Sequence, residues 1–143
     1  MVPIPLSLTS LAVRWLHVLA ATIVVGGSVL TWLLLRIEVP SDAVIVARGY
    51  EWLFWAAVGA LVMTGVGNLG TFAPTLPGGH WRTTLDLKLG LFLVVLCGSA
   101  LRVSLLSRLD RDGEQTRLLQ RAYGATAVGL VGLLTLAEVL AHG

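Results

Sequence analysis

The sequence predicts an all-α integral membrane protein, a four-helix bundle whose helices run up, down, up and down. Three observations favour this fold. The 143 residues are 56% hydrophobic and only 13% charged, with a mean hydropathy of +0.85, whereas a soluble domain is about a quarter charged. Four apolar stretches approach the roughly 20 residues that a helix needs to cross the hydrocarbon core. These stretches are continuously apolar and lack the alternation of a membrane β-barrel.

The first two predicted spans are residues 11–35 and 52–70. The first has no basic segment before it and is too long for a signal peptide, so we expect a helix that is retained. The second ends at the glycine- and proline-rich segment GTFAPTLPGGHWR, which predicts a loop that contains His80 and Trp81.

The third and fourth predicted spans are residues 83–106 and 121–140. The third has Lys88 and Arg102 near its two ends, and the fourth contains Glu138. The charged segment SRLDRDGEQTRLLQR between them is interpreted as a solvated connection. Because the connections are short, sequential helices are expected to be antiparallel, and residues 1–143 are expected to form a single domain.

The distribution of basic residues predicts the direction of the helices. Seven of the ten lysines and arginines fall in the predicted loops 36–51 and 102–121, namely Arg36, Arg48, Arg102, Arg108, Arg111, Arg117 and Arg121. Arg14, Arg82 and Lys88 lie on the opposite side. Since basic residues are in excess in cytoplasmic loops, we expect an inner-membrane protein with both of these loops in the cytoplasm and both termini outside.

With this direction, the unusual polar residues gather near the outer ends of the spans. His17 lies roughly 9 Å and Lys88 roughly 8 Å below those ends, at 1.5 Å per residue. Glu138 and His142 are four residues apart in the sequence, and therefore share one face of the fourth span. Arg14 lies one turn before His17. The sequence predicts no comparable cluster in the cytoplasmic half.

Ionisable groups inside a membrane are functional candidates because their burial is costly. His17 is a candidate haem ligand, metal ligand or proton relay. Lys88 has two interpretations. Its long stem can reach outward to the phosphate layer, or it stays buried, where desolvation favours a neutral amine that can bind a metal. His80 and His142 are interpreted first as anchors at the membrane interface and only second as ligands.

The first and third spans would be diagonal in a simple bundle, so His17 and Lys88 could face a shared cavity. Small residues follow at helical spacing on the first span, and Gly124, Val128 and Thr135 form a similar stripe on the fourth. Such stripes indicate either close helix packing or room for a flat macrocycle.

Other residues have simpler interpretations. Met63 is expected in the core and Cys97 as a buried thiol, while Arg48 and Glu51 are interpreted as charges at a helix end. The sequence has no basic block with interleaved aromatics, which argues against nucleic-acid binding. It has no CxxC motif or methionine cluster, so no dedicated copper motif is visible.

Two segments, AVRWLHVLAATIVVGGSVLTWLLLR and HWRTTLDLKLGLFLVVLCGSALR, resemble two related families. One is the CopD-type copper-resistance membrane domain, and the other is the HemJ-type protoporphyrinogen oxidase, which contains b-type haem. The resemblance lies in Trp15-Leu16-His17 with its following glycines and in the Lys88-Leu89-Gly90-Leu91 pattern. In the HemJ-type family the histidine and lysine of these motifs are associated with haem binding and activity, which implies such roles for His17 and Lys88.

The leading hypothesis is a b-type haem protein for one-electron transfer, as a subunit of a larger respiratory or redox complex. His17 would be one axial ligand and Lys88 or His142 the other, with Arg14 and Glu138 close to the cofactor. Copper handling is the alternative, with His17, His80, Glu138 and His142 as ligands at an external entry. Porphyrinogen oxidation and a structural accessory role are the further alternatives, so whether the chain is an enzyme is left open.

Overall fold

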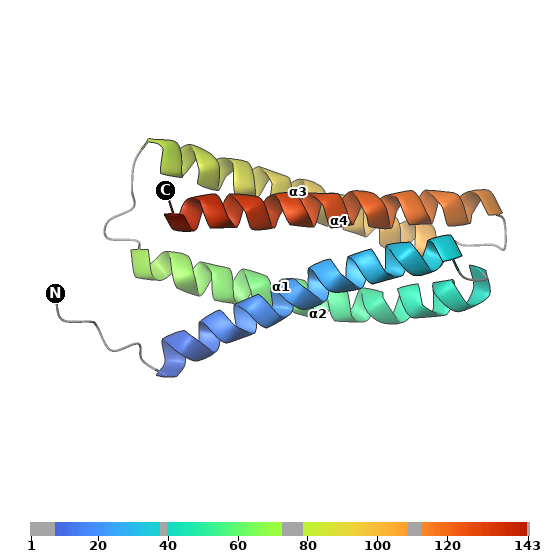
Figure 1. Cartoon of the computed structure of the whole chain (residues 1–143), viewed down its shortest axis with the longest axis horizontal. Coiled ribbons are helices and arrows are strands. Elements are labelled where there is room, and N and C mark those ends of the chain that lie inside the picture. Colours follow the sequence, from blue (N-terminus) through green and yellow to red (C-terminus); the bar gives the residue numbers. More distant parts are fainter. Residues whose placement is uncertain (1–7, 38–39, 73–78, 109–112, 143) are drawn as a thin grey trace.

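The computed structural model describes residues 8–37, 40–72, 79–108 and 113–142, except for the side chains of residues 40–41, 67–72, 113–114 and 141–142. The described part forms four helices and no strand: α1 (Leu8–Ile37), α2 (Pro40–Phe72), α3 (His80–Ser107) and α4 (Gly113–His142) (Figure 1). This confirms the prediction of an all-α four-helix membrane bundle.

All four helices are long and apolar enough to cross a membrane. They contain 28 to 33 residues each, more than the roughly 20 that the hydrocarbon core requires. Large apolar side chains cover the outside of the bundle, and Trp52, Met63 and Val128 are 85%, 78% and 75% exposed. Such a surface fits contact with lipid tails, and the predictions that Met63 lies in the core and that Cys97 is buried are wrong.

The helices extend beyond the predicted spans. α2 begins at Pro40 and α4 at Gly113, so the segments predicted as cytoplasmic loops, 36–51 and 102–121, are mostly helical. Counting apolar residues locates only the part of a helix that lies in hydrocarbon, whereas helix formation continues into polar turns. A proline is well suited to the first turn of α2 because its fixed φ angle is already helical.

The start of α3 also differs from the prediction. His80 and Trp81 are the first residues of this helix and do not lie in a loop. Gly79 precedes them with a φ of 66°, a left-handed conformation that glycine adopts without a Cβ clash. Gly79 therefore marks the start of α3.

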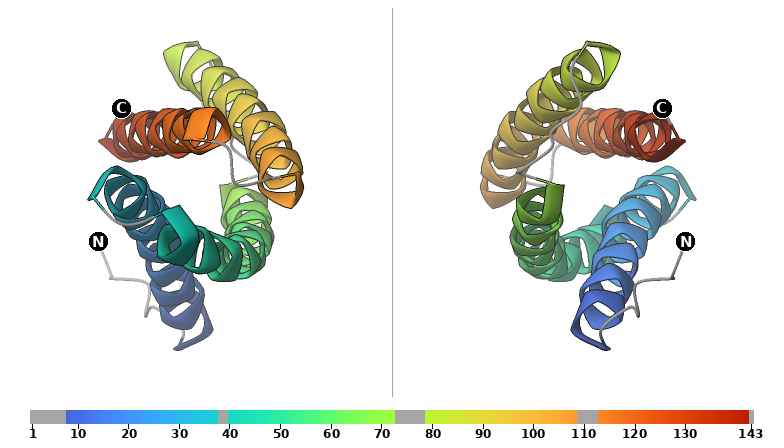
Figure 2. Two further views of the ribbon diagram at one scale, coloured as in Figure 1. Left: turned by 90° about the vertical axis from the view of Figure 1, so that its right-hand side faces the viewer. Right: turned by 90° about the vertical axis from the view of Figure 1, so that its left-hand side faces the viewer.

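The helices pack as two antiparallel hairpins. α1 packs along α2, α3 packs along α4, and the contact between α1 and α4 joins the hairpins (Figures 1 and 2). α2 and α3 make little direct contact. The bundle is thus closed between α1 and α4, whereas few interactions link α2 to α3.

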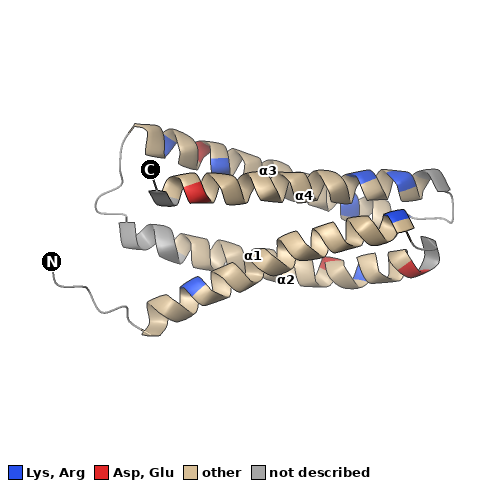
Figure 3. Cartoon of the chain, viewed as in Figure 1, with Lys and Arg blue, Asp and Glu red and all other residues tan. Residues whose placement is uncertain are grey.

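Basic residues are concentrated where α1 and α3 end and α2 and α4 begin (Figure 3). We call this the arginine-rich end and the opposite one the His17 end. The buried face of α1 runs from Ala20 to Leu35, and that of α3 from Val95 to Leu106. Tight packing is therefore displaced toward the arginine-rich end, and the helix segments around His17 and Lys88 are less buried.

A close approach between α1 and α2 lies within this core. A Cβ on Gly27 would overlap the ring carbons of Tyr50, so only glycine fits there. The Tyr50 hydroxyl donates to the carbonyl oxygen of Val24 at 2.5 Å and lies 2.9 Å from the Ser28 hydroxyl. Gly27 of α1 therefore serves helix packing.

The predicted small-residue stripe on α4 meets another helix only in part, at Gly124, where a Cβ would lie 3.0 Å from Trp32 Nε1 of α1. Val128 and Thr135 are exposed, whereas Tyr123, Thr126 and Leu130 are buried. A hydroxyl-bearing tyrosine and threonine occupy the inner face because the cluster described below provides their hydrogen-bond partners. Residue size and polarity alone therefore do not identify the buried face of α4.

Candidate functional site

His17 lies on α1, partly buried, and faces α2. Its Nδ1 is 2.6 Å from the Thr64 hydroxyl oxygen. The Thr64 hydroxyl itself lies 2.7 Å from the Ala60 carbonyl oxygen, one helical turn earlier. Because a hydroxyl has one proton and Ala60 offers only an acceptor, Thr64 donates to Ala60 and accepts from His17 Nδ1–H.

This arrangement sets the tautomer of His17. With the proton on Nδ1, a neutral imidazole has its free lone pair on Nε2. Metal-binding histidines commonly have one ring nitrogen fixed by such a hydrogen bond, which orients the ring for the other nitrogen to bind. Gly65 leaves space beside the ring, since a Cβ there would lie 4.0 Å from His17 Cε1. The Nε2 atom of His17 has no hydrogen-bond partner among the described residues.

Lys88 lies on α3 and is also partly buried. It lies near the His17 imidazole, although no hydrogen bond joins the two side chains in the described part of the chain. The structure therefore brings the two residues into one region, and it gives His17 its direct partner on α2.

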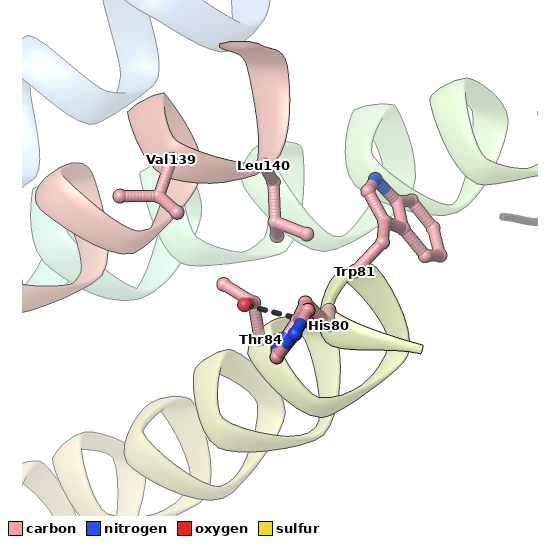
Figure 4. Close-up of a pocket in the computed structure, with 5 residues that line it drawn as sticks. All are labelled: His80, Trp81, Thr84, Val139 and Leu140. Carbon is pink, nitrogen blue, oxygen red and sulfur yellow. Dashed lines mark hydrogen bonds between the residues drawn. The ribbon is translucent and has the colours of Figure 1, made fainter. Parts of the chain in front are cut away.

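The other predicted site residues are not gathered around His17 in the same way. Arg14 and Glu138 are exposed on α1 and α4. The His142 side chain falls outside the described residues. His80 lines a small pocket of about 80 Å³ with Trp81 and with the last turns of α4 (Figure 4).

This pocket at the His17 end has little polar character. It is lined by His80, Trp81, Thr84, Val139 and Leu140 (Figure 4). The Thr84 hydroxyl donates to the His80 carbonyl oxygen at 2.9 Å. Of the five side chains that line the pocket, only the His80 imidazole is ionisable. Among the described residues, no group of three or more histidines, cysteines, aspartates or glutamates could hold a metal.

A buried ion pair lies in the other half of the bundle. Arg102 on α3 is 0% exposed, and its Nε lies 2.6 Å from Glu51 Oε1 on α2. Its Nη2 donates to Glu51 Oε2 at 3.2 Å, which completes a two-pronged contact. This pair joins the two helices that otherwise barely meet, α2 and α3.

Side chains from α4 complete this cluster. The Tyr123 hydroxyl donates to Glu51 Oε1 at 2.6 Å, and Arg102 Nη1 donates to the Thr126 hydroxyl at 2.9 Å. The guanidinium carbon lies 4.6 and 4.4 Å from the ring centres of Phe54 and Tyr123. A charge removed from water is costly unless it is paired and hydrogen-bonded, and here every partner is supplied by another helix.

Ser99 lies one turn before Arg102 on the same buried face of α3. Its hydroxyl is buried without a hydrogen-bond partner among the described residues. Such a group is costly to leave unpaired, so the Ser99 hydroxyl can still form a hydrogen bond that no described side chain provides.

Sequence reasoning misses this cluster. It places Arg102 near the end of the third span and counts it with the following loop, and it places Glu51 at a helix end. The prediction that this half of the bundle has no polar cluster is wrong. A signal that could have found it is Pro40, because a proline suits the first turn of a helix, and α2 does begin there, eleven residues before Glu51. A carboxylate at that depth requires a cation, and Arg102 lies at the matching depth of an antiparallel helix.

The family described as copper resistance protein D matches residues 44–140, which run from the first turns of α2 almost to the end of α4. The chain belongs to the copper resistance protein D family. No curated protein and no solved structure matches it.

The family match bears differently on the two polar regions. Glu51, Lys88, Arg102 and Tyr123 all lie within the matched residues, whereas His17 precedes them. The resemblance to a CopD-type domain is therefore confirmed, and the chain is a copper-resistance-type integral membrane protein. The match does not extend to HemJ-type proteins, and haem binding stays a prediction.

Proposed function

We propose that this copper resistance protein D family member handles copper ions as cargo in the inner membrane. His17 is the proposed residue that takes the ion, and the His17 end faces outside. The observation that carries the proposal is the His17–Thr64 hydrogen bond of 2.6 Å, which leaves Nε2 as the free lone pair. Imidazole nitrogen is a suitable copper ligand, and the family match supports copper as the ion.

The second ligand comes from the same end of the bundle. Lys88 can serve only as a neutral amine, because an ammonium has no lone pair. Its partial burial on α3 favours that form. His142 is the competing ligand, and Arg14 and Glu138 are proposed to influence the ion from the exposed surface. Among the described residues soft ligands do not contribute, since Met63 and Cys97 are exposed on the outside of the bundle.

Copper affinity of the purified protein tests this proposal. Thr64→Val keeps the shape of the side chain but removes the acceptor for Nδ1–H, and we expect a 10- to 100-fold loss, about the range found when a metal ligand loses its orienting partner. Thr64→Ser retains the hydroxyl and should retain most of the affinity. Thr22→Val is the matched control, because the hydroxyl of this exposed threonine donates to the Val18 carbonyl oxygen of its own helix.

Two results would reject the copper proposal. Equal copper affinity in the Thr64→Val and Thr22→Val variants would show that the orientation of His17 has no role. The proposal would also fail if His17→Ala bound copper as tightly as the unchanged protein.

Haem b is the competing proposal, because the same Nε2 could serve as an axial ligand to haem iron. Bound haem would supply one-electron chemistry, with a redox subunit as partner, and axial ligand identity would set its potential. A visible absorption spectrum of the gently purified protein, oxidised and reduced, separates the two. Stoichiometric haem together with unchanged copper handling would replace the copper proposal.

A further inference from the structure

A groove of about 560 Å³ lies between α1 and α4, on the lipid-facing side of the bundle. Val29 and Trp32 of α1 form one wall, and the α4 wall begins at Arg121 and ends at Val131. The volume is within the range of small-molecule sites, about 300–1,000 Å³. The groove is independent of the copper proposal, since His17 lies farther along α1.

Small residues of α4 create this groove. Gly124, Ala125 and Val128 line it, and a Cβ on Gly124 would already lie 3.0 Å from Trp32 Nε1. The indole therefore rests against the backbone of α4 and forms one wall. A larger residue at these positions would fill the space.

The groove has the length of one membrane leaflet. Ten residues separate Arg121 from Val131, which is about 15 Å at 1.5 Å per residue. This is half of the roughly 30 Å hydrocarbon core. Its charged end is the arginine-rich end of the bundle, so it begins at the level of the head groups and extends toward the membrane centre.

Two arginines stand at the charged end. Arg121 lines the groove, and the Arg36 guanidinium lies over the Trp32 ring, 5.1 Å from its centre. Neither arginine forms an ion pair with a carboxylate of the described part of the chain, where the pair found is Glu51–Arg102. An apolar channel that ends at two such cations is complementary to a lipid with a negatively charged head group.

We propose that this groove binds an anionic phospholipid of the leaflet at the arginine-rich end, with one acyl chain beside Trp32 and its phosphate between Arg36 and Arg121. Basic pockets between membrane helices on the cytoplasmic side are known to bind anionic head groups. A zwitterionic lipid offers the same chains but no net charge, so the arginines select against it.

Native mass spectrometry of the detergent-solubilised protein, titrated with phosphatidylglycerol or phosphatidylcholine, tests the proposal. Arg36→Gln/Arg121→Gln should weaken phosphatidylglycerol binding roughly 30-fold, because each arginine near the membrane surface contributes about fivefold to binding an anionic lipid. Phosphatidylcholine binding should change little. Arg48→Gln/Arg108→Gln is the matched control, since both residues are exposed, at the same end and outside the groove.

A second variant separates the groove from the charges. Ala125→Phe fills the groove and keeps both arginines, and it should lower the binding of both lipids. Far-ultraviolet circular dichroism checks that each variant is folded. Equal binding of the two lipids, an equal loss in the control, or a lipid-free dimer whose contact covers Ala125 would overturn the proposal.

Discussion

Breaking the buried ion pair is expected to cost more than any other change of a single charge in this protein. Arg102 is 0% exposed, and Glu51 accepts from it and from Tyr123. Removing one partner of a buried pair leaves an uncompensated charge and costs about 3–5 kcal/mol. We therefore expect Glu51→Gln and Arg102→Met each to lower the free energy of unfolding by that amount.

The double variant provides the decisive comparison. With both charges removed, no ion remains to be desolvated, and Tyr123 can still donate to the amide oxygen of the glutamine introduced at position 51. Replacing a whole buried pair by neutral groups is often nearly neutral, so we expect the double variant to lie within about 3 kcal/mol of the unchanged protein. The coupling energy in the double-mutant cycle should then be at least about 3 kcal/mol.

Unfolding in mixed detergent micelles, followed by far-ultraviolet circular dichroism, gives these free energies. Arg48→Gln is the control, because Arg48 is exposed on the same helix as Glu51, and it should change stability by no more than about 0.5 kcal/mol. Additive losses in the double variant, or single losses no larger than the control's, would refute the assignment of this pair as the link between α2 and α3.

Two further predictions concern packing and direction. Gly27→Ala should lower the free energy of unfolding by at least about 2 kcal/mol, since overpacking a close contact typically costs about 1–3 kcal/mol and the new Cβ would overlap the Tyr50 ring. Gly26→Ala is the control and should be tolerated, because no atom lies within 4 Å of the position of its Cβ. Equal melting temperatures of the two variants would contradict this prediction. In a Cys97→Ser background, a cysteine at Gly79 should react with an impermeant thiol reagent outside intact cells, and a cysteine at Gly113 should not; the reverse pattern would invert the proposed direction.

The number and type of helices could be predicted because hydrophobicity over about 20 residues is a strong signal. The ends of the helices could not be predicted, since a helix continues into polar turns that lack a hydrophobic pattern. α2 shows this clearly, because twelve of its residues, from Pro40 to Glu51, precede the predicted span. That error placed Glu51 at the membrane edge when it lies within the bundle.

The candidate site was only partly predictable for a related reason. His17 stood out because it is an isolated ionisable residue in an apolar run. Its partner Thr64 carried no signal, since a threonine in a membrane helix usually bonds its own helix, as Thr64 also does through Ala60. The Glu51–Arg102 pair depends on which faces of α2 and α3 meet, and 51 residues separate the two positions.

The most direct test of copper handling is X-ray absorption at the copper edge of purified protein loaded with Cu(I). We predict the outer-shell scattering of imidazole in the unchanged protein and its loss in His17→Ala, or its halving if His142 is the second ligand, with His80→Ala as the matched control that leaves it unchanged. A His17→Ala protein with an unaltered copper spectrum would contradict the account, as would a preparation that contains stoichiometric haem and takes up no copper.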